Sequence, residues 1–408
     1  MVKEGYKQTE IGVIPEDWDC VLMLSKCELL NGLTYTPDNV KDYGTLVIRS
    51  SNIQNNHLVF SDNVFVDLPV DENKLIKKND IVVCVRNGSA ALIGKCAIAG
   101  KDYPVTFGAF MAVLRGNHNR YIFQLLQQGT IQKHISKNSG ATINQITNGD
   151  FKKILVPFPH EDKEQERIAE ALSDIDELIS SLEKLIAKKK AIKQGAMQHL
   201  LTGKTRLPGF TAEWKKIQFG DYCNIVRGGS PRPIQDFISK TNNGINWIKI
   251  GDVTPEDKYI ESTQEKIIEE GVFRSRFVKK GDFILSNSMS FGRPYILKID
   301  GCIHDGWLAI QNYQETFSED FLYYTLSSDY VYKQYIQMAA GSSVQNLNKE
   351  KVQNLFLYLP EKKEQAAISN ALSDMDNEIV SLMRNYKKIC DTKQGMMQQL
   401  LTGKIRLM

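Results

Sequence analysis

The residue types that could do chemistry are present, but their spacing matches no familiar catalytic constellation. The histidines are scattered and form no His-Glu-x-x-His pair. Gly88 to Lys95 is similar to a phosphate loop, yet it has five residues between its glycines instead of four, and Cys96 follows where Ser or Thr is needed. Pro37-Asp38 and Glu72-Asn73-Lys74 have the residue types of a metal nuclease without an equivalent in the second half of the chain. No two prolines are adjacent, which excludes the Asn-Pro-Pro-aromatic motif of amino-methyltransferases. We therefore predict no catalytic residue and no metal site.

Composition limits the class of protein. The 408 residues are 42% hydrophobic and 24% charged, which is typical of a globular chain with two to four domains. A net charge of +3 allows a nucleic-acid partner only if the basic groups gather on one surface. Seven cysteines without a C-x-x-C pair indicate reduced thiols. No run of 18 apolar residues and no apolar export segment are present, so we expect a cytoplasmic protein without a membrane partner.

One long segment occurs twice. Lys163 to Leu207 recurs at Lys363 to Leu407, at a spacing of 200 residues and with 25 of 45 positions identical. A duplication of this length indicates two copies of one architectural unit and an internal pseudo-two-fold repeat.

Each copy of the repeat has the pattern of a long helix. Apolar residues from Ile168 to Ile186 are spaced alternately four and three, and Ile368 to Tyr386 repeat that register. Prolines precede each segment, and Leu-Thr-Gly ends it with a glycine of the type that terminates helices. About 36 residues give a helix of roughly 54 Å with a narrow apolar seam, whose best partner is the other copy.

Charge favours antiparallel pairing of the two helices. The first half of the first copy is rich in Glu and Asp, and its second half carries five lysines between Lys184 and Lys193. Antiparallel packing sets acidic halves beside basic halves. A solvated face that suits the helix dipole explains these lysines better than direct DNA contact does.

The regions before the helices have alternating apolar runs typical of β domains with helical additions. Short segments that match between the two regions, here called landmarks, occur in the same order in both. LVIRSSNI corresponds to NWIKIGDV, KKNDIVVCVRNGS to KKGDFILSNSMS, and GAFMAVLRG to DGWLAIQN. The expected fold class is α+β, with two mainly β domains separated by two long antiparallel coiled-coil helices. The predicted segments are a first mainly β domain at 1–160, a first repeated helix at 161–207, a second mainly β domain at 208–360 and a second repeated helix at 361–408.

These features together resemble a known family. IGVIPEDW at Ile11 to Trp18, KEQ-x-x-I at Lys163 and Lys363, ALSD at Ala171 and Ala371, and LLTGK at Leu200 and Leu400 are similar to the specificity subunit of type I restriction-modification systems. The resemblance covers essentially the whole chain. It implies that 1–160 and 208–360 are target-recognition domains and that 161–207 and 361–408 are spacer helices. It also implies a non-catalytic subunit that binds double-stranded DNA and directs two adenine-methylating subunits and two ATP-driven restriction and translocase subunits. S-adenosylmethionine, ATP and Mg would then bind to the partners, and this chain would hold no cofactor.

The physical pattern agrees with that expectation. Two readers held about 54 Å apart by a stiff helical spacer can each enter a major groove, because equivalent groove positions recur every 34 to 36 Å. We therefore expect an asymmetric bipartite DNA site whose spacer length is fixed by the helices.

Base and phosphate contacts need forked donors and acceptors on loops. We predict that DNA is contacted in the first domain by Arg49, Ser51, Asn52, Arg86, Asn87, Ser89, Lys95, Thr142, Asn144 and Gln145. In the second domain the candidates are Arg227, Arg232, Lys249, Asp252, Asn287, Ser288, Ser290, Arg293, Ser342, Ser343, Gln345 and Asn346. Each has an ordinary alternative: Asn87-Gly88 is also a turn sequence, and Arg49 could pair with a carboxylate. Gly140 and Gly341 suit backbone shape more than contact.

Some residues that are identical in the two repeats are expected to face away from the seam, which suggests that they dock the methyltransferase subunits. The candidates are Gln194, Gln198, Lys204, Arg206, Gln394, Gln398, Lys404 and Arg406. The alternative is that the copies look alike because they pack on each other.

Two other functions were weighed. A self-contained methyltransferase or nuclease would need a cofactor or metal site and would bind S-adenosylmethionine alone. A coiled-coil scaffold without DNA reading would lack a salt-dependent affinity for DNA.

Overall fold

The computed structural model describes residues 2–138, 145–241, 243–287, 292–339 and 347–407. The chain separates into two compact units. Unit 1 comprises Met1–Lys184 and Met383–Met408, and unit 2 comprises Leu185–Leu382. Each unit is therefore built from two stretches of helix and one mainly β region, and each is described separately below.

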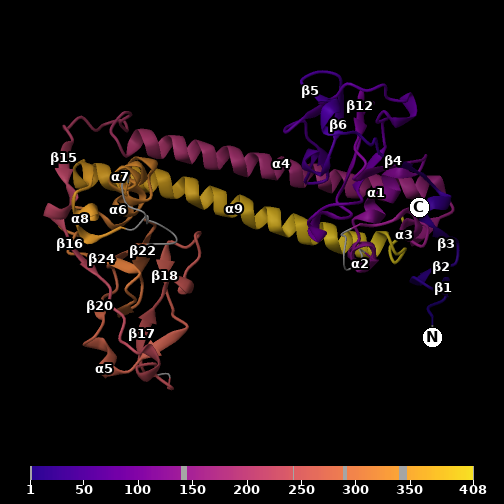
Figure 1. Ribbon diagram of the computed structural model, residues 1–408. Helices are drawn as coiled ribbons and strands as arrows, with labels where there is room; N and C mark the ends of the chain where they lie inside the picture. Colours follow the sequence, from indigo (N-terminus) through magenta and orange to yellow (C-terminus); the bar gives the residue numbers. More distant parts are fainter. Residues whose placement is uncertain (1, 139–144, 242, 288–291, 340–346, 408) are drawn as a thin grey trace. The chain divides into compact units, whose positions relative to one another are not determined.

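The repeat forms the two long helices α4 (Asp162–Leu200) and α9 (Lys362–Leu400), both labelled in Figure 1. Each helix gives its first half to one unit and its second half to the other. The glycines predicted to end them, Gly203 and Gly403, have φ values of +69° and +68°, the left-handed conformation that glycine adopts without a Cβ penalty. The predicted helix in each repeat is therefore present, with the expected termination.

Inside each unit the first residues of the predicted seam are buried in a core to which both helical halves contribute. In unit 1, Ile168 and Leu172 of α4 lie in one core with Leu400 and Leu401 from the other repeat. In unit 2, Ile368 and Leu372 of α9 lie in the equivalent core with Leu200 and Leu201. Burial of these apolar side chains is the main favourable term that holds the helical halves together.

Ion pairs join the basic second half of one helix to the acidic first half of the other. In unit 1, Lys393 Nζ lies 2.6 Å from Asp176 Oδ1. In unit 2, Lys193 Nζ lies 2.5 Å from Asp376 Oδ1, and Lys189 pairs with Glu378 at 2.6 Å. The separation of charge along the repeat thus matches the pairing found within each unit.

Unit 1 contains two four-stranded sheets, with strand orders β11-β10-β13-β4 and β12-β6-β9-β5, together with small two-stranded sheets β1-β2, β14-β3 and β7-β8. The strands are β1 (Tyr6–Thr9), β2 (Gly12–Pro15), β3 (Trp18–Leu22), β4 (Glu28–Asn31), β5 (Val40–Lys41), β6 (Thr45–Ile48), β7 (Ile53–Gln54), β8 (His57–Leu58), β9 (Val64–Val66), β10 (Ile81–Cys84), β11 (Cys96–Ile98), β12 (Val105–Phe107), β13 (Met111–Arg115) and β14 (Leu155–Pro159). The short helices are α1 (Asn119–Leu126), α2 (Gly129–Asn138) and α3 (Asn148–Phe151).

Unit 2 contains a five-stranded sheet of order β16-β24-β21-β22-β18, a four-stranded sheet of order β19-β17-β23-β20 and the pair β15-β25. The strands are β15 (Lys215–Gln218), β16 (Asn224–Arg227), β17 (Ile245–Ile248), β18 (Tyr259–Ile260), β19 (Glu265–Ile267), β20 (Arg276–Val278), β21 (Phe283–Ser286), β22 (Pro294–Leu297), β23 (Gly301–Ile303), β24 (Trp307–Gln311) and β25 (Phe356–Leu359). The short helices are α5 (Glu269–Val272), α6 (Glu319–Leu326), α7 (Asp329–Ala339) and α8 (Lys349–Gln353).

The two units share one β frame despite their different sequences. β10 pairs antiparallel with β13, as β21 does with β24, and β6 pairs parallel with β12, as β17 does with β23. A buried carboxylate precedes the central strand in both: Asp80 binds Arg115, and Asp282 accepts a hydrogen bond from Gln311. The recurring sequence landmarks therefore occupy equivalent places in the two frames.

A buried cluster of one Trp, one Glu and one Arg, here called the Trp–Glu–Arg cluster, closes each unit. In unit 1, the Glu164 carboxylate accepts from Trp18 Nε1 at 3.1 Å and from Arg406 Nε at 2.5 Å. In unit 2, Glu364 accepts from Trp214 Nε1 at 2.8 Å and from Arg206 Nε at 2.6 Å. Charge-assisted hydrogen bonds of this kind compensate for burying a carboxylate.

Candidate nucleic-acid interface

The candidate residues of unit 1 gather at one edge of its sheets. β6 and β12 run parallel, so the loops that follow them, Arg49–Asn52 and Gly108–Phe110, begin at the same edge. β10 ends beside the start of β13, because Cys84 pairs with Met111. The loop Arg86–Ser89 therefore emerges at that edge as well.

Direct contacts join these loops into what we call the first loop cluster, comprising Arg49–Asn52, Arg86–Ser89, Phe110 and Gln145. Asn87 Nδ2 donates to Ser50 Oγ at 3.0 Å, and Arg86 forms an isolated β-bridge with Gln145. The Arg86 guanidinium lies 5.0 Å from the centre of the Phe110 ring, which is 55% exposed. Ser51, Arg86 and Ser89 are also exposed. The cluster thus presents a cation, an aromatic ring and hydroxyl groups on one surface.

Two predicted contacts in unit 1 have internal roles instead. Asn52 is completely buried: its Oδ1 accepts from the Arg49 backbone N–H at 3.0 Å, and its Nδ2 donates to the carbonyls of Val59 and Ser61. The prediction that Asn52 contacts DNA is therefore wrong, because its amide shapes the loop. Arg49 pairs with Asp62 at 2.8 Å, which is the alternative that its sequence left open. Lys95 is half-buried just before β11.

The equivalent edge of unit 2 carries what we call the second loop cluster, comprising Arg227–Arg232, Asn287 and His304–Asp305. The carboxylate of Asp305 accepts from Ser230 Oγ at 3.0 Å and lies 3.4 Å from Arg232 Nη2. Its backbone carbonyl accepts from Asn287 Nδ2 at 2.9 Å and from Arg227 Nε at 3.4 Å. Two other loops thus converge on the loop that carries Asp305.

Asp305 is poised to act as a hydrogen-bond acceptor. Partial burial raises the pKa of its carboxyl group, but the hydrogen bond from Ser230 and the charges of His304 and Arg232 outweigh burial and leave the pKa below its ordinary value. An ionised carboxylate at a groove surface accepts from the amino group of cytosine. Arg232, whose side chain is 82% exposed, supplies a forked donor next to it.

Other predicted residues of unit 2 are committed to internal bonds. Asp252 accepts from the backbone N–H groups of Lys249 at 2.7 Å and Gln264 at 3.2 Å. Lys249 Nζ pairs with Glu265 at 2.8 Å. Asn287 is buried, and the guanidinium of Arg293, which is exposed, donates to the Pro255 carbonyl. Asn287 is therefore a loop-shaping residue, and its predicted DNA contact is wrong for the same reason as that of Asn52. Asp252 also shapes its loop, but it is only half-buried, and its DNA contact stays a prediction.

Several predicted DNA contacts lie outside the described residues. They are Thr142, Asn144, Ser288, Ser290, Ser342, Ser343, Gln345 and Asn346, with Gly140 and Gly341. Conversely, the sequence alone did not single out Phe110, Ser230 or Asp305. Asp305 is the first residue of the recurring DGWLAIQN landmark, but only the parallel pairing of β17 with β23 brings it near Lys249.

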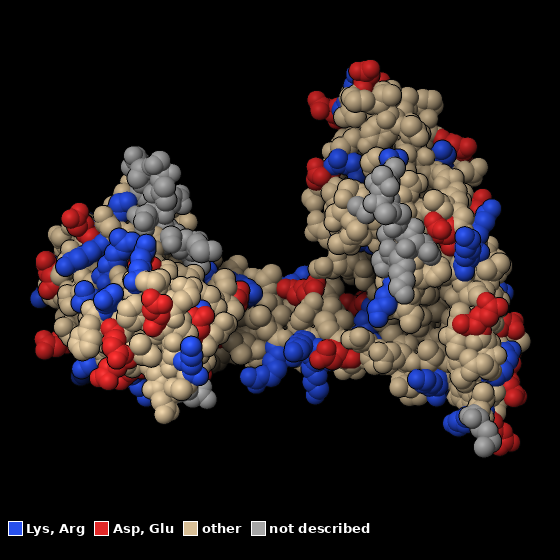
Figure 2. Space-filling view, turned by 60° about the horizontal axis from the view of Figure 1, so that its bottom comes forward, with Lys and Arg blue, Asp and Glu red and all other residues tan. Residues whose placement is uncertain are grey.

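Charge on the surface agrees with an anionic ligand. Figure 2 shows Lys and Arg side chains gathered on the face of unit 2 that it presents, at the left of the picture.

Other kinds of site find little support. Burial raises the pKa of the Cys27, Cys96 and Cys223 thiols to about 12, which disfavours their reactive thiolate form. Within the described ranges, His, Cys, Asp and Glu form no group of three that could hold a metal ion. No helix in the described part of the chain is long and apolar enough to cross a membrane.

The residues predicted to dock partners fall into two groups. Arg206 and Arg406 are held in the Trp–Glu–Arg clusters, so internal packing accounts for their recurrence, which is the alternative that the sequence left open. Their docking role stays a prediction. The side chains of Gln194, Gln198, Lys204, Gln394, Gln398 and Lys404 are exposed.

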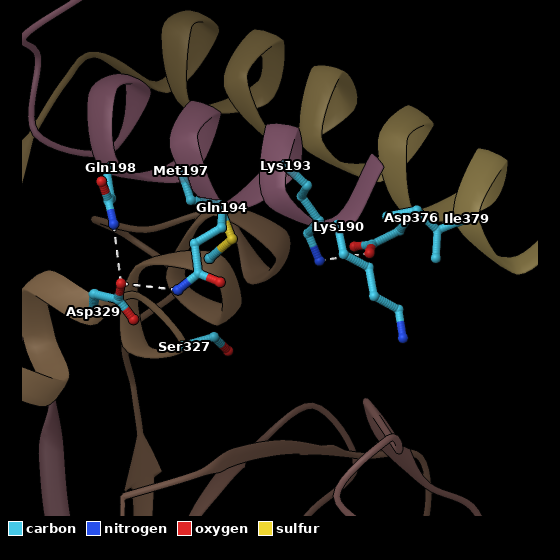
Figure 3. A pocket seen from close by; sticks show the side chains of 9 residues that line it. All are labelled: Lys190, Lys193, Gln194, Met197, Gln198, Ser327, Asp329, Asp376 and Ile379. Atoms are coloured by element: carbon cyan, nitrogen blue, oxygen red, sulfur yellow. Dashed lines mark hydrogen bonds and ion pairs between the residues drawn. The ribbon is translucent and has the colours of Figure 1, made fainter. Parts of the chain in front are cut away.

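The two glutamine pairs differ in their surroundings. Gln194 and Gln198 both donate to Asp329 Oδ2, at 2.8 and 3.0 Å, beside a cavity of about 350 Å³ (Figure 3). Gln394 and Gln398 line a cavity of about 880 Å³ in unit 1 together with Gly129. The exposed ends of the two repeats are therefore similar in sequence but not identical in chemistry.

The fold and its two loop clusters define a duplicated, mainly β recognition protein built on a repeated helix. Residues 15–194 and 211–389 each match the family described as the type I restriction modification DNA specificity domain. The chain belongs to this family, which confirms the resemblance drawn from its motifs.

Relatives of similar length agree with that assignment. The putative type I restriction enzyme MjaX specificity subunit of Methanocaldococcus jannaschii is 26% identical over 99% of this chain and 97% of its own length. The type I restriction enzyme StySPI specificity subunit of Salmonella potsdam is 26% identical over 88% of this chain and 81% of its own length.

Solved structures share the fold. The type I restriction-modification S subunit from M. genitalium has a TM-score of 0.58 and 17% identity, covering 94% of this chain and 96% of that one. A chain from a study of complex assembly and conformational transition in the type I R-M system has a TM-score of 0.59 and 17% identity, covering 96% and 99%.

Proposed function

We propose that this chain is the DNA-reading subunit of a type I restriction-modification complex, and that each loop cluster reads one half of an asymmetric bipartite site. The observation that carries the proposal is that one β frame occurs twice and presents different chemistry at the same edge. Unit 1 offers Arg86 and Phe110, whereas unit 2 offers Asp305 and Arg232. Two sets of loops that carry different hydrogen-bond donors and acceptors on the same β frame can bind two different base sequences.

In this proposal the long helices form an antiparallel coiled coil that fixes the DNA spacer. Each helix has 39 residues, which at 1.5 Å per residue gives about 58 Å. That length exceeds the 34 to 36 Å between successive equivalent positions in the major groove. The ion pairs within each unit, such as Lys193 with Asp376, support antiparallel packing.

The partners in this proposal are two methyltransferase subunits and two restriction and translocase subunits. The exposed glutamines and lysines at the ends of the repeats are the proposed docking positions, one set in each unit. The chain itself would perform no catalysis and hold no cofactor, so S-adenosylmethionine, ATP and Mg would bind to the partners in the cytoplasm.

The test is to express the chain with its methyltransferase subunit and to map N6-methyladenine on plasmid DNA by single-molecule sequencing. We expect one asymmetric bipartite motif. Exchange of residues 1–160 for those of another specificity subunit should change one half of the motif, and exchange of residues 208–360 should change the other. A stable complex that methylates without any motif, or binds DNA without salt dependence, would favour a scaffold and refute DNA reading.

A further inference from the structure

A loop of unit 2 that was not among the predicted DNA contacts lies beside the second loop cluster. We call residues Phe273–Arg276 the Phe273 loop. It leads into β20, whose Arg276 pairs with Ile303 at the end of β23. Ser275 Oγ donates to the Ile303 carbonyl at 3.3 Å, and Arg276 Nε donates to the Arg227 carbonyl at 3.4 Å. The loop therefore shares the sheet edge that carries Arg227 and Asp305.

Phe273 projects from this loop into solvent. Its side chain is 87% exposed, whereas a large apolar side chain is ordinarily buried. Two turn hydrogen bonds hold the backbone around it, from Arg274 N to the Gly271 carbonyl at 3.2 Å and from Ser275 N to the Val272 carbonyl at 3.0 Å. The ring is thus presented on a fixed turn.

The charge around Phe273 suits a polyanion. Arg274 and Arg276 stand on either side of Ser275, both exposed, and no acidic residue occurs within the loop; Glu269 and Glu270, also exposed, lie one turn earlier in α5. The Arg274 guanidinium lies 5.2 Å from the centre of the Phe237 ring, which anchors its side chain on the surface. An apolar surface without cations would suit a protein partner better than this arrangement does.

The corresponding segment of unit 1 has the opposite character. There Ile76 forms a bridge with Tyr103 ahead of β12, and the residues before it make a short 3-10 helix, Glu72–Lys74, capped by Asp71. Asp71 and Glu72 stand where unit 2 has the Phe273 loop, and both are exposed. The acidic side chains would repel phosphates. The aromatic loop is therefore a specialisation of unit 2 and not a part of the common frame.

We propose that Phe273 acts as an apolar wedge that presses its ring against a base step of the DNA bound to unit 2, while Arg274 and Arg276 bind the adjacent phosphates. The proposal rests on the proposed DNA-reading function. Side chains such as Phe enter partly opened base steps and kink the duplex, and flexible pyrimidine–purine steps are the easiest to open. Unit 2 then selects DNA by deformability as well as by base contacts, and unit 1 does not.

The test uses the complex of the full chain with its methyltransferase subunits and duplexes that carry its mapped site. Binding is measured by fluorescence anisotropy across a salt series for wild type, Phe273→Ala, Phe273→Trp and the double variant Arg274→Ala/Arg276→Ala. The matched control is Phe356→Ala, which removes another exposed ring of unit 2, 46% exposed, from the separate β15–β25 sheet. A second duplex series places a single mismatch at each step of the half-site assigned to unit 2.

The wedge predicts a specific pattern. Phe273→Ala should bind about tenfold more weakly with an unchanged salt slope, because the ring touches no phosphate. Phe273→Trp should retain affinity, and the arginine double variant should reduce the salt slope by about 1.8. Wild type should bind one mismatch position more tightly than the intact site, and Phe273→Ala should lose that preference.

The outcomes separate the two proposals. If wild type binds with a steep salt dependence but Phe273→Ala behaves like Phe356→Ala, the wedge is refuted and DNA reading stands. The wedge is also refuted if Phe273→Ala releases a methyltransferase subunit while leaving DNA affinity unchanged. If wild type itself has no salt-dependent affinity, the proposed function fails.

Discussion

Removal of Arg406 is expected to destabilise unit 1 by about 3 kcal/mol. The Glu164 side chain is only 2% exposed, and Arg406 supplies two of its donors, at 2.5 and 2.8 Å. After Arg406→Ala the carboxylate keeps only the neutral Trp18 indole at 3.1 Å. Breaking a buried ion pair costs roughly 3–5 kcal/mol, and the 19% exposure of Arg406 places this pair at the lower end, because water can partly replace it.

The second contact of Arg406 adds little to this cost. Asp17 binds the same guanidinium at 2.6 Å but is 56% exposed, and surface pairs contribute about 1 kcal/mol at most. The double variant Arg406→Ala/Glu164→Gln removes the uncompensated charge and should therefore be more stable than Arg406→Ala alone. This non-additivity is the signature of a shared buried charge.

Hydrogen exchange read by mass spectrometry suits this test, because a chain with two units need not unfold in one step. Peptides from β3 and the first half of α4 should lose protection in Arg406→Ala, and peptides of unit 2 serve as the internal reference. Unchanged protection in unit 1, or a double variant no more stable than Arg406→Ala, would refute the argument that a buried Glu164 charge depends on Arg406.

Three further outcomes are expected. Asn52→Ala should destabilise the loop that follows β6 by about 2 kcal/mol, because it leaves buried backbone groups unpaired, and limited proteolysis should cut there faster than in the exposed control Ser51→Ala. Arg232→Ala should lower the slope of DNA affinity against salt by about 0.9 if this exposed arginine binds one phosphate, and an unchanged slope would exclude that contact. The hydrogen bond from Arg406 lowers the pKa of the Asp17 carboxyl from its ordinary value of 3.8. Ionised Asp17 therefore contributes its full stabilisation of the folded protein above pH 3.8, and this contribution is lost as the pH falls through the lower pKa of the folded state. In Asp17→Asn the free energy of unfolding should thus fall less steeply with decreasing pH in the acid range than in wild type. Equal slopes for the two proteins would contradict the contribution of Asp17.

Much of the helical architecture could be predicted because its determinants are local and repeated. The heptad spacing placed Ile168 and Leu172 in a seam, and both are buried. The separation of charge along each copy matches the ion pairs within the units, such as Lys393 with Asp176. Gly203 was identified as a terminator by residue type, since few other residues adopt its φ of +69° without strain.

The candidate site was harder to predict because residue type does not reveal burial. Asn52 and Asp252 have side chains typical of base readers, yet each accepts a hydrogen bond from the backbone three residues earlier and closes a turn. Arg406 lies on a repeated helix terminus and points into a cluster formed with Trp18, almost 390 positions away in sequence. Such contacts depend on tertiary pairing, and a single sequence carries no local signal for them.

Phe110 and Asp305 show the same limit at the surface. Each lies at the start of a landmark that recurs in both domains, but the landmark alone does not say which of its side chains faces outward. The parallel pairs β6-β12 and β17-β23 bring these residues to the edge where the other loops end. Strand pairing between segments more than 50 residues apart is required before the loops become neighbours.

The exchange of helical halves between the units also sets the order in which the protein can mature during synthesis. All of unit 2 lies within Leu185–Leu382, so it can close once that stretch has emerged from the ribosome. Unit 1 begins first but lacks Leu400, Leu401 and Arg406, which complete its core and its Trp–Glu–Arg cluster. At roughly 5–20 residues per second, the gap between Lys184 and Met383 keeps the apolar face of α4 uncovered for about 10–40 s on each nascent chain. The half that is translated first is therefore the last to fold, and it is the half that most needs protection from aggregation.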